Sequence, residues 1–185
     1  VVIGVLNKDF DIEKLFEKTK GKIELVEPNF FTPVSLHEAI SDIPMPTENG
    51  ECTLNPCESN YQASMRNATG TIKNHVASKH NGLAVGRMQN VGAGQNWQVL
   101  EEEIHSVHSG AYGRLEWNQP TMTITTRFDT PAGGRFIHPE ENRTLTPREA
   151  ARVQSFPDSF EFIGNKTIVC KQIGNAVPPK LSFFL

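Results

Sequence analysis

One long stretch with little apolar periodicity constrains what this chain can fold into. Between Pro44 and about Gly113, Asn, Ser, Gly and Thr dominate, and few apolar residues recur at the spacing of a helix or a strand. A stretch of this length exceeds a simple connection within a compact domain. We therefore expect residues 44–113 to form loop-rich structure, as a functional insertion or a separate lobe.

The residues before this stretch have the pattern of an α/β sheet. Residues 1–6 form a continuous apolar run rich in β-branched side chains, which is typical of a buried parallel strand. Asp11 precedes apolar residues at helical spacing, Gly21 can end that helix, and a second strand is predicted at residues 23–26. This order indicates the closing βα units of a sheet whose earlier strands are absent.

Three local patterns predict further elements. Ser35 and Glu38 fit a capping box that opens a short helix, and Pro44 terminates it. Residues 146–149 combine an N-cap Thr, a Pro at the first helical position and a Glu at the third, which predicts a second helix. The alternating, β-branched residues 122–126 predict a strand.

Both ends of the chain carry apolar residues. The sequence opens at Val1 without an initiator Met, and it stops within the apolar residues 181–185. A strand or helix that starts or stops abruptly leaves an apolar face without a partner. We therefore expect neighbouring segments on both sides.

Composition favours a soluble, globular protein. Of the 185 residues, 37% are hydrophobic and 21% are charged, unlike the composition of a disordered chain. No apolar run approaches the roughly 20 residues that span a bilayer, and the start lacks a signal-peptide pattern. We therefore expect no membrane partner and a cytoplasmic location. Three cysteines, an odd number, favour reduced thiols over a disulfide framework.

The charge distribution points to a polyanionic partner more strongly than the net charge does. The net charge is -3, yet no Asp or Glu occurs between Glu58 and Glu101. A surface that faces phosphates needs such a window, because a carboxylate there would repel the nucleic-acid backbone. The alternative is a polar loop region that lacks acids by chance. The cations of this acid-free window are Arg66, Lys73, Lys79 and Arg87, with His75 and His80 beside them.

Two blocks in the second half of the chain resemble the DNA (cytosine-5)-methyltransferases. Residues 142–158 resemble the ninth sequence block of that family, and residues 172–179 (Gln-Ile-Gly-Asn-Ala-Val-Pro-Pro) resemble the tenth. Residues 119–126 resemble the end of its target-recognition region. Weaker similarities occur in the expected order at Asn74-His75, at residues 92–94 before Trp97, at residues 112–115 and in the opening strand.

The resemblance implies a two-lobed enzyme. A doubly wound α/β domain would bind S-adenosyl-L-methionine and carry out the chemistry, and a small, loop-rich α+β lobe would read double-stranded DNA. Residues 1–43 would be the end of the catalytic domain and residues 44–173 the target-recognition domain. Residues 174–185 would be a helix that returns to the catalytic domain.

The returning helix is expected to line the cofactor pocket. Pro178 and Pro179 suit a first helical turn, and residues 174–175 supply a tight, cap-competent approach. Free N–H groups at such a helix start can meet a carboxylate. In the family, this region receives the methionine part of the cofactor. The cofactor-binding candidates are therefore Asn175, Ala176 and Val177, of which Ala176 can contribute only its backbone.

Arginines in this region fall into two groups. Arg148 and Arg152 are expected to organise the recognition lobe, because arginines on a helix of the ninth block more often tie it to surrounding loops through bidentate hydrogen bonds. Other residues are the better candidates for touching DNA, with phosphate contacts expected ahead of base contacts. These DNA-binding candidates are Arg87, Arg114, Thr123, Thr125 and Arg127.

The catalytic residues of the family are not found in this sequence. Its mechanism uses base flipping, attack of a Cys thiolate on cytosine and methyl transfer to carbon five. The Pro-Cys-Gln loop, the Glu-Asn-Val block and the Gly-rich cofactor loop are all missing. Residues 55–58 (Asn-Pro-Cys-Glu) mimic the first only superficially, since Glu58 replaces Gln and a circular permutation would be needed. Residues 92–94 are expected to form a turn. We assign no catalytic residue and expect the chain to need an N-terminal catalytic half as partner.

Two other functions remain open. Cys52 and Cys57 followed by His75 and His80 have the ligand order of a zinc-bearing DNA-binding module, although the central gap is long. A non-catalytic DNA-recognition subunit that pairs with a separate catalytic chain would share the structure of the methyltransferase segment. The two possibilities would differ only in whether the catalytic half was removed from the same polypeptide or is encoded as a separate one.

Overall fold

The computed structural model describes residues 32–101, 104 and 109–183, together with Glu13, Lys14, Glu17, Lys18, Lys20 and Gly21. The strands predicted at residues 1–6 and 23–26 lie outside the described residues. The six described residues between those strands are helical, in agreement with the helix predicted there.

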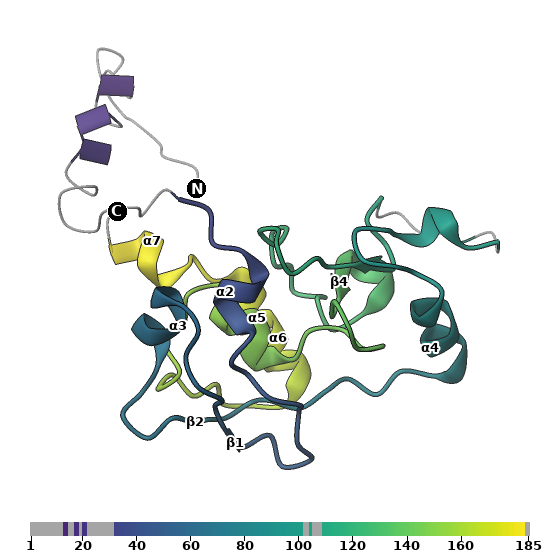
Figure 1. Cartoon of the computed structure of the whole chain (residues 1–185), viewed down its shortest axis with the longest axis horizontal. Coiled ribbons are helices and arrows are strands. Elements are labelled where there is room, and N and C mark those ends of the chain that lie inside the picture. Colours follow the sequence, from purple (N-terminus) through teal and green to yellow (C-terminus); the bar gives the residue numbers. More distant parts are fainter. Residues whose placement is uncertain are drawn as a thin grey trace.

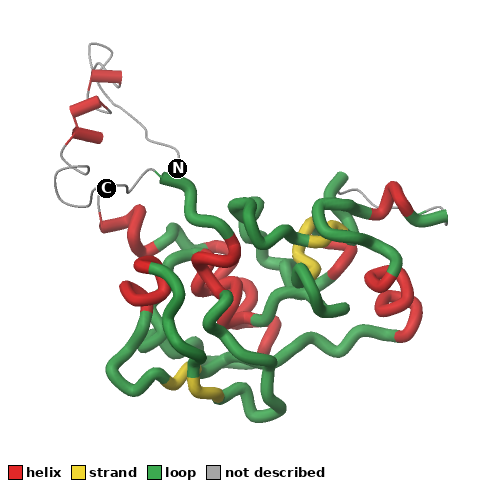
Figure 2. Tube along the Cα trace, in the orientation of Figure 1, coloured by secondary structure: helices red, strands yellow, loops and turns green. Residues whose placement is uncertain are grey.

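Short elements joined by long loops make up the described chain (Figures 1 and 2). Strand β1 (Cys52–Thr53) pairs antiparallel with β2 (Thr71–Ile72), and β3 (Gly113–Arg114) pairs parallel with β4 (Arg135–Ile137). Among the described residues between 44 and 113, loops predominate, as predicted, although two α-helices, a 3₁₀ turn and two short strands interrupt them. The helices are α2 (Leu36–Ile40), α3 (Asn60–Met65), α4 (Gly82–Gln89), α5 (Pro147–Val153), α6 (Lys166–Asn175) and α7 (Pro179–Phe183), with 3₁₀ turns η1 (Trp97–Val99) and η2 (Pro131–Gly133); the strands are β1 (Cys52–Thr53), β2 (Thr71–Ile72), β3 (Gly113–Arg114) and β4 (Arg135–Ile137).

Both predicted capping boxes are confirmed. At α2, the Ser35 hydroxyl accepts a hydrogen bond from the Glu38 N–H, and the Glu38 carboxylate accepts one from the Ser35 N–H at 2.9 Å. At α5, Thr146 and Glu149 make the same reciprocal pair, and Pro147 occupies the first turn. These bonds satisfy N–H groups that a helix start otherwise leaves unpaired.

The strand predicted at residues 122–126 is wrong. Residues 121–125 are neither strand nor helix, and no strand in the described part of the chain pairs with them. The side chains still alternate, because Ile124 is buried while Thr123 and Thr125 are exposed. Alternation therefore arises here from an extended segment that lies across a helical core, where no partner strand is available to complete a ladder.

The described apolar residues form two clusters of unequal size. The main cluster joins α2, α5 and α6, which lie together near the middle of the molecule in Figure 1. The α4 cluster is formed by Met88, Ala111, Tyr112 and Ile137. The main cluster consists of Leu36, Ala39, Ile40, Leu115, Ile124, Phe128, Phe136, Leu145, Ala150, Ala151, Phe156, Phe162, Val169, Cys170 and Ile173.

Helix α2 belongs to the same core as α5 and α6. Leu36, Ala39 and Ile40 are almost fully buried there, and the first N–H groups of α2 bond the carbonyls of Trp117 and Gln119 at 2.9 Å. The boundary expected at residue 43, between the catalytic and target-recognition domains, thus lies just after α2, a helix that packs in the main cluster. The boundaries at residues 43 and 173 remain predictions.

Candidate functional site

The segment 117–128 presents a row of polar side chains from a fixed backbone. Ile124 and Phe128 anchor it in the main cluster, with 4% and 0% of their surface exposed. Between and beyond these anchors, Thr123, Thr125 and Arg127 are exposed. The Arg127 side chain is 69% exposed, and its guanidinium bonds Thr130 Oγ1 at 3.1 Å. The anchors thus hold three candidate DNA-binding residues outward.

Arg87 lies on α4 beside an open pocket of about 630 Å³. Its guanidinium carbon lies 5.5 Å from the centre of the Tyr112 ring, and an N–H donates to the Tyr112 hydroxyl at 3.4 Å. A Cβ atom added at Gly82 or Gly86, which also line this pocket, would meet no atom within 4 Å. The two glycines leave room beside Leu83 and Arg87 for a ligand to approach the helix backbone.

Arg114 does not have the surroundings expected of a DNA-contacting residue. It is 5% exposed, and its guanidinium donates to four backbone carbonyls and one side-chain amide oxygen. The partners lie at the end of α4 and in the loop after β4, so the side chain ties these two regions together. Burial also lowers the pKa of Arg114. The prediction that Arg114 binds DNA is corrected, because its N–H groups are already used. The five acceptors are Met88 O, Val91 O, His138 O, Glu141 O and Asn142 Oδ1.

Part of the positive charge in the acid-free window is paired with acids from elsewhere in the chain. Arg66 donates to Asp42 Oδ2 at 2.7 Å, and it also bonds the Asn55 carbonyl. The Lys73 ammonium lies 3.0 Å from Glu161 Oε2. The window in the sequence is therefore not a uniformly basic surface in space.

Arg152 joins three parts of the main cluster. The side chain is fully buried, and its guanidinium makes a bidentate pair with Asp158 at 2.9 and 2.6 Å. It also bonds Asp42 Oδ1 at 3.1 Å and the Ala39 carbonyl at 3.3 Å. Since Asp42 and Ala39 belong to the α2 region, this one side chain fixes α2 against α5 and against the loop that follows α5.

Arg148 is also buried, but backbone carbonyls take up its N–H groups. It donates to the carbonyls of Lys73, Phe160 and Pro157, at 2.8, 2.6 and 3.4 Å. Burial lowers the pKa of Arg148 to about 10, an effect that the charge of Asp158 offsets only in part. The residue connects the segment after β2 with the loop after α5.

A third ionic group was not anticipated from the sequence. Arg143 makes bidentate bonds with both Glu149 and Glu141, at 2.7 to 2.9 Å. Burial alone would raise the pKa of Glu149, but the hydrogen bonds and charge of Arg143 outweigh it and lower that pKa to about 2. Glu149 could be assigned only a capping role from sequence, since nothing in a local pattern marks Arg143 as its partner.

His75 connects two distant segments and does not have the surroundings of a metal ligand. One ring nitrogen lies 2.8 Å from Thr146 Oγ1 and the other 2.7 Å from the Pro44 carbonyl. Burial lowers the pKa of His75. Among the described residues, which include Cys52, Cys57 and His80, no three such side chains gather as a metal site. The Cys57 thiol is exposed and donates to the Ser59 carbonyl.

The approach to the last helix differs from the prediction. Gly174 and Asn175 end α6, so they do not form a turn before a new helix, and α7 begins at Pro179. The Ala176 N–H donates to the Ile173 carbonyl at 3.3 Å. The expected free N–H at Ala176 is therefore absent, because a C-terminal helix cap uses it. Asn175 and Val177 are exposed.

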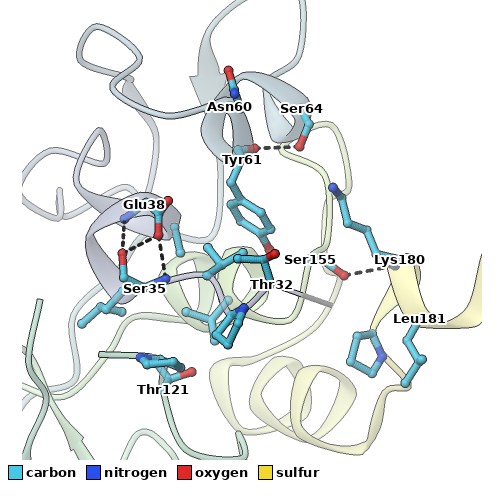
Figure 3. A pocket seen from close by; sticks show the side chains of 17 residues that line it. Thr32, Ser35, Glu38, Asn60, Tyr61, Ser64, Thr121, Ser155, Lys180 and Leu181 are labelled. Atoms are coloured by element: carbon cyan, nitrogen blue, oxygen red, sulfur yellow. Dashed lines mark hydrogen bonds between the residues drawn. The ribbon is translucent and has the colours of Figure 1, made fainter. Parts of the chain in front are cut away.

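A second pocket, of about 740 Å³, lies where α2, α3, α5 and α7 meet. Figure 3 shows Tyr61 pointing into this region from α3, with Ser155 and Lys180 across from it. The Tyr61 hydroxyl donates to the Arg152 carbonyl at 2.6 Å, and the Lys180 ammonium lies 5.4 Å from the Tyr61 ring centre. Burial raises the pKa of Tyr61. This pocket thus places α7 beside the Arg152 network.

Comparison of the sequence with known proteins identifies the family. The family model for C-5 cytosine-specific DNA methylases matches residues 1–185. The chain belongs to the C-5 cytosine-specific DNA methylase family. Against DNA (cytosine-5)-methyltransferase 3 of Arabidopsis thaliana it is 33% identical in an alignment of 180 positions that covers 84% of this chain and 12% of that protein. Against the type II methyltransferase M.DdeI of Desulfomicrobium norvegicum it is 34% identical over 80% of this chain and 40% of that protein.

A solved structure shares the fold of this family member. A DNA modification methyltransferase encoded within a prophage (E. coli) matches with a TM-score of 0.63 and 21% identity, over 88% of this chain and 48% of that one. The α/β fold of a methyltransferase domain is therefore shared. The chain spans less than half the length of each of these three proteins. In the part of the chain that the structure describes, no helix has the length and apolarity needed to cross a membrane.

Proposed function

We propose that this chain is the C-terminal segment of a DNA (cytosine-5)-methyltransferase, where it recognises double-stranded DNA and completes the cofactor site. The observation that carries the proposal is the row of exposed Thr123, Thr125 and Arg127 on an anchored backbone. Hydroxyl and guanidinium groups are the usual donors to phosphate oxygens, and a fixed backbone keeps their register along a duplex. Arg87, beside the open face of α4, extends the proposed DNA-binding set.

Arg148 and Arg152 act in this proposal as organisers of the recognition lobe. Their guanidinium groups are buried and engaged by carbonyls and carboxylates, so neither presents an N–H to DNA. By fixing α5 against α2 and against the segments around it, they hold the main cluster on which residues 117–128 lie. Rigid support of this kind preserves the geometry of a binding surface.

S-adenosyl-L-methionine is the methyl donor in the proposed reaction, and this chain would line one side of its site. Asn175 offers an exposed side-chain amide and Val177 an exposed apolar surface, which suit the polar and apolar parts of a methionine group. Ala176 can contribute only its carbonyl, since its N–H is bonded within the helix cap. The nucleophilic Cys and the rest of the cofactor site come from an N-terminal catalytic half, on the same polypeptide or on a separate one.

Methyl incorporation tests the proposal directly. Labelled S-adenosyl-L-methionine and mixed-sequence duplex DNA are incubated with this chain alone, and with this chain plus the polypeptide encoded immediately upstream. Incorporation is expected only in the second mixture. Incorporation by this chain alone would assign a catalytic role to Cys57. Absence of incorporation in both mixtures, with no binding of duplex DNA by the chain, would overturn the proposal.

A further inference from the structure

The end of α6 and the exposed segment 123–127 are in direct backbone contact at Gly174. A Cβ atom placed on Gly174 would lie 2.4 Å from the Thr126 nitrogen and 2.5 to 2.6 Å from the carbonyl carbon and oxygen of Thr125. Real Cβ atoms essentially never approach other atoms so closely. All three atoms belong to the backbone, so no side chain can rotate away to make room. Only Gly permits this approach.

Neither side of the contact can retreat at low cost. The segment is held on one side by Ile124 and on the other by Phe128, both buried in the main cluster. On the helix side, Ile173 is fully buried, and its carbonyl accepts hydrogen bonds from Gln154 Nε2 at 3.1 Å and from the Ala176 N–H. Close-packed interiors transmit such displacements and do not absorb them.

The contact joins the two parts of the proposed site. On one side lie Thr123, Thr125 and Arg127, which are proposed to meet DNA. On the other side, Gly174 is followed directly by residues 175–177, which are proposed to line the cofactor site. The backbone φ angle of Gly174 is not in the left-handed region, so space, and not a special conformation, explains why Gly stands there.

We propose that Gly174 is a positioning residue that sets the distance between the DNA-binding segment and the cofactor-binding end of α6. This inference rests on the proposed function, because it assigns a purpose to the contact between those two segments. A larger residue at position 174 pushes residues 125–126 away from α6 and turns the exposed row out of register with a DNA backbone. Thermodynamic linkage then makes DNA binding and cofactor binding sensitive to one another through this contact.

The test compares Gly174→Ala with Gly86→Ala in the 185-residue chain. Both glycines lie in helices, but a Cβ at Gly86 meets no atom within 4 Å, so the second variant controls for the change in helix propensity. Hydrogen exchange by mass spectrometry reports the mobility of residues 119–128. Fluorescence anisotropy with a labelled mixed-sequence duplex reports DNA binding, and circular dichroism confirms that each variant is folded at the assay temperature.

Gly174→Ala is expected to speed exchange in residues 119–128 and to weaken duplex binding by on the order of tenfold, about the loss of one good contact. Gly86→Ala is expected to leave exchange in residues 119–128 unchanged; because Gly86 lines a pocket with Arg87 of the proposed DNA-binding set, this variant is a control for exchange and not for duplex binding. Exchange and affinity both equal to wild type in Gly174→Ala would overturn the inference. If the wild-type chain does not bind the duplex, the proposed DNA recognition fails, whereas the exchange comparison still decides whether Gly174 positions the segment.

A measurement on the wild-type chain covers the case in which Gly174→Ala does not fold. Added duplex is expected to slow exchange in residues 119–128 and also at the end of α6, residues 173–176, because the two backbones touch. Protection of residues 119–128 alone would show that the contact does not couple the segments, and the inference would be withdrawn.

Discussion

The main cluster and the α4 cluster are held together in different ways. In the main cluster, Arg152 pairs with carboxylates inside a large apolar core that joins three helices. The α4 cluster has four buried apolar residues, and Arg114 connects it to the rest of the chain through neutral oxygens. Removing one member of a buried ion pair leaves a charge without compensation, whereas removing a donor to a carbonyl leaves a neutral dipole. We therefore expect stability to depend on the first region and local mobility on the second.

The largest effect is expected for Arg152→Met. The substitution leaves Asp158 buried without its bidentate partner, and Asp42 keeps only Arg66. We expect a loss of about 3–5 kcal/mol in the free energy of unfolding, because a buried charge is left unpaired. Urea denaturation measures it, with exposed Lys171→Met as a control that should change the value by less than about 0.5 kcal/mol. A loss of under about 1 kcal/mol in Arg152→Met would contradict the assigned role.

Arg114→Met tests the α4 cluster in the same way. Five oxygen acceptors lose their donor, but no buried carboxylate is left unpaired. We therefore expect a smaller loss, of about 2–3 kcal/mol, in the free energy of unfolding. Hydrogen exchange should rise in α4 and in residues 138–142 while α5 and α6 keep their protection. If exchange rises uniformly over both clusters, the two regions unfold as one unit and the distinction between them is lost.

Acid should weaken the main cluster through Glu149. Because the folded-state pKa of about 2 lies below the ordinary 4.5, the Glu149 carboxylate contributes stability above about pH 4.5 that is lost as the pH falls toward 2. The stability difference between wild type and Glu149→Gln should therefore narrow by about 2 kcal/mol between pH 7 and pH 3. Urea titrations at a series of pH values measure this difference. A constant difference would show that Glu149 is not held ionised by Arg143.

The smallest effect on stability is expected for Arg127, in the exposed row Thr123, Thr125 and Arg127. This side chain takes part in the hydrogen bonds of neither Arg152 nor Arg114. Arg127→Ala should change the free energy of unfolding by less than about 0.5 kcal/mol. If Arg127 meets a phosphate, the variant should bind duplex DNA more weakly and reduce the slope of log affinity against log salt by about 0.9. Anisotropy titrations at several salt concentrations give this slope, with Lys171→Ala as a control of the same charge change. An unchanged slope would remove Arg127 from the DNA-binding set.

The correct predictions from sequence were those that depend on neighbouring residues. Ser35 with Glu38 and Thr146 with Glu149 are three residues apart, so the cap can be recognised within one turn of chain. The strand expected at residues 122–126 was wrong, because a strand needs a partner and the alternating pattern does not reveal whether one is present. The first helical turn predicted at Pro178 and Pro179 is confirmed, since α7 begins at Pro179. The turn expected before it at residues 174–175 was wrong, because α6 extends through those residues.

Among the DNA-binding candidates, too, the sequence alone did not show which residues depend on distant contacts. Exposure of Thr123, Thr125 and Arg127 agrees with what a surface role requires, but their contact with DNA stays a prediction. Arg114 is of the same residue type as Arg127, yet it is buried, and its N–H groups bond acceptors that lie more than 20 residues away. Residue type alone cannot distinguish an arginine that faces a phosphate from one that binds carbonyl groups.

The sequence by itself determined the family of this chain and the places where its capped helices begin, because block order and capping pairs are written in consecutive residues. Only the tertiary structure decided which arginines are buried, what they bind and why Gly174 must lack a side chain. Arg152 and Asp42 are 110 residues apart, and Gly174 meets a backbone almost 50 residues earlier. Such contacts depend on how the core packs. A close-packed interior has no space for an added side chain at Gly174, and a buried charge such as that of Arg152 is costly unless it is paired.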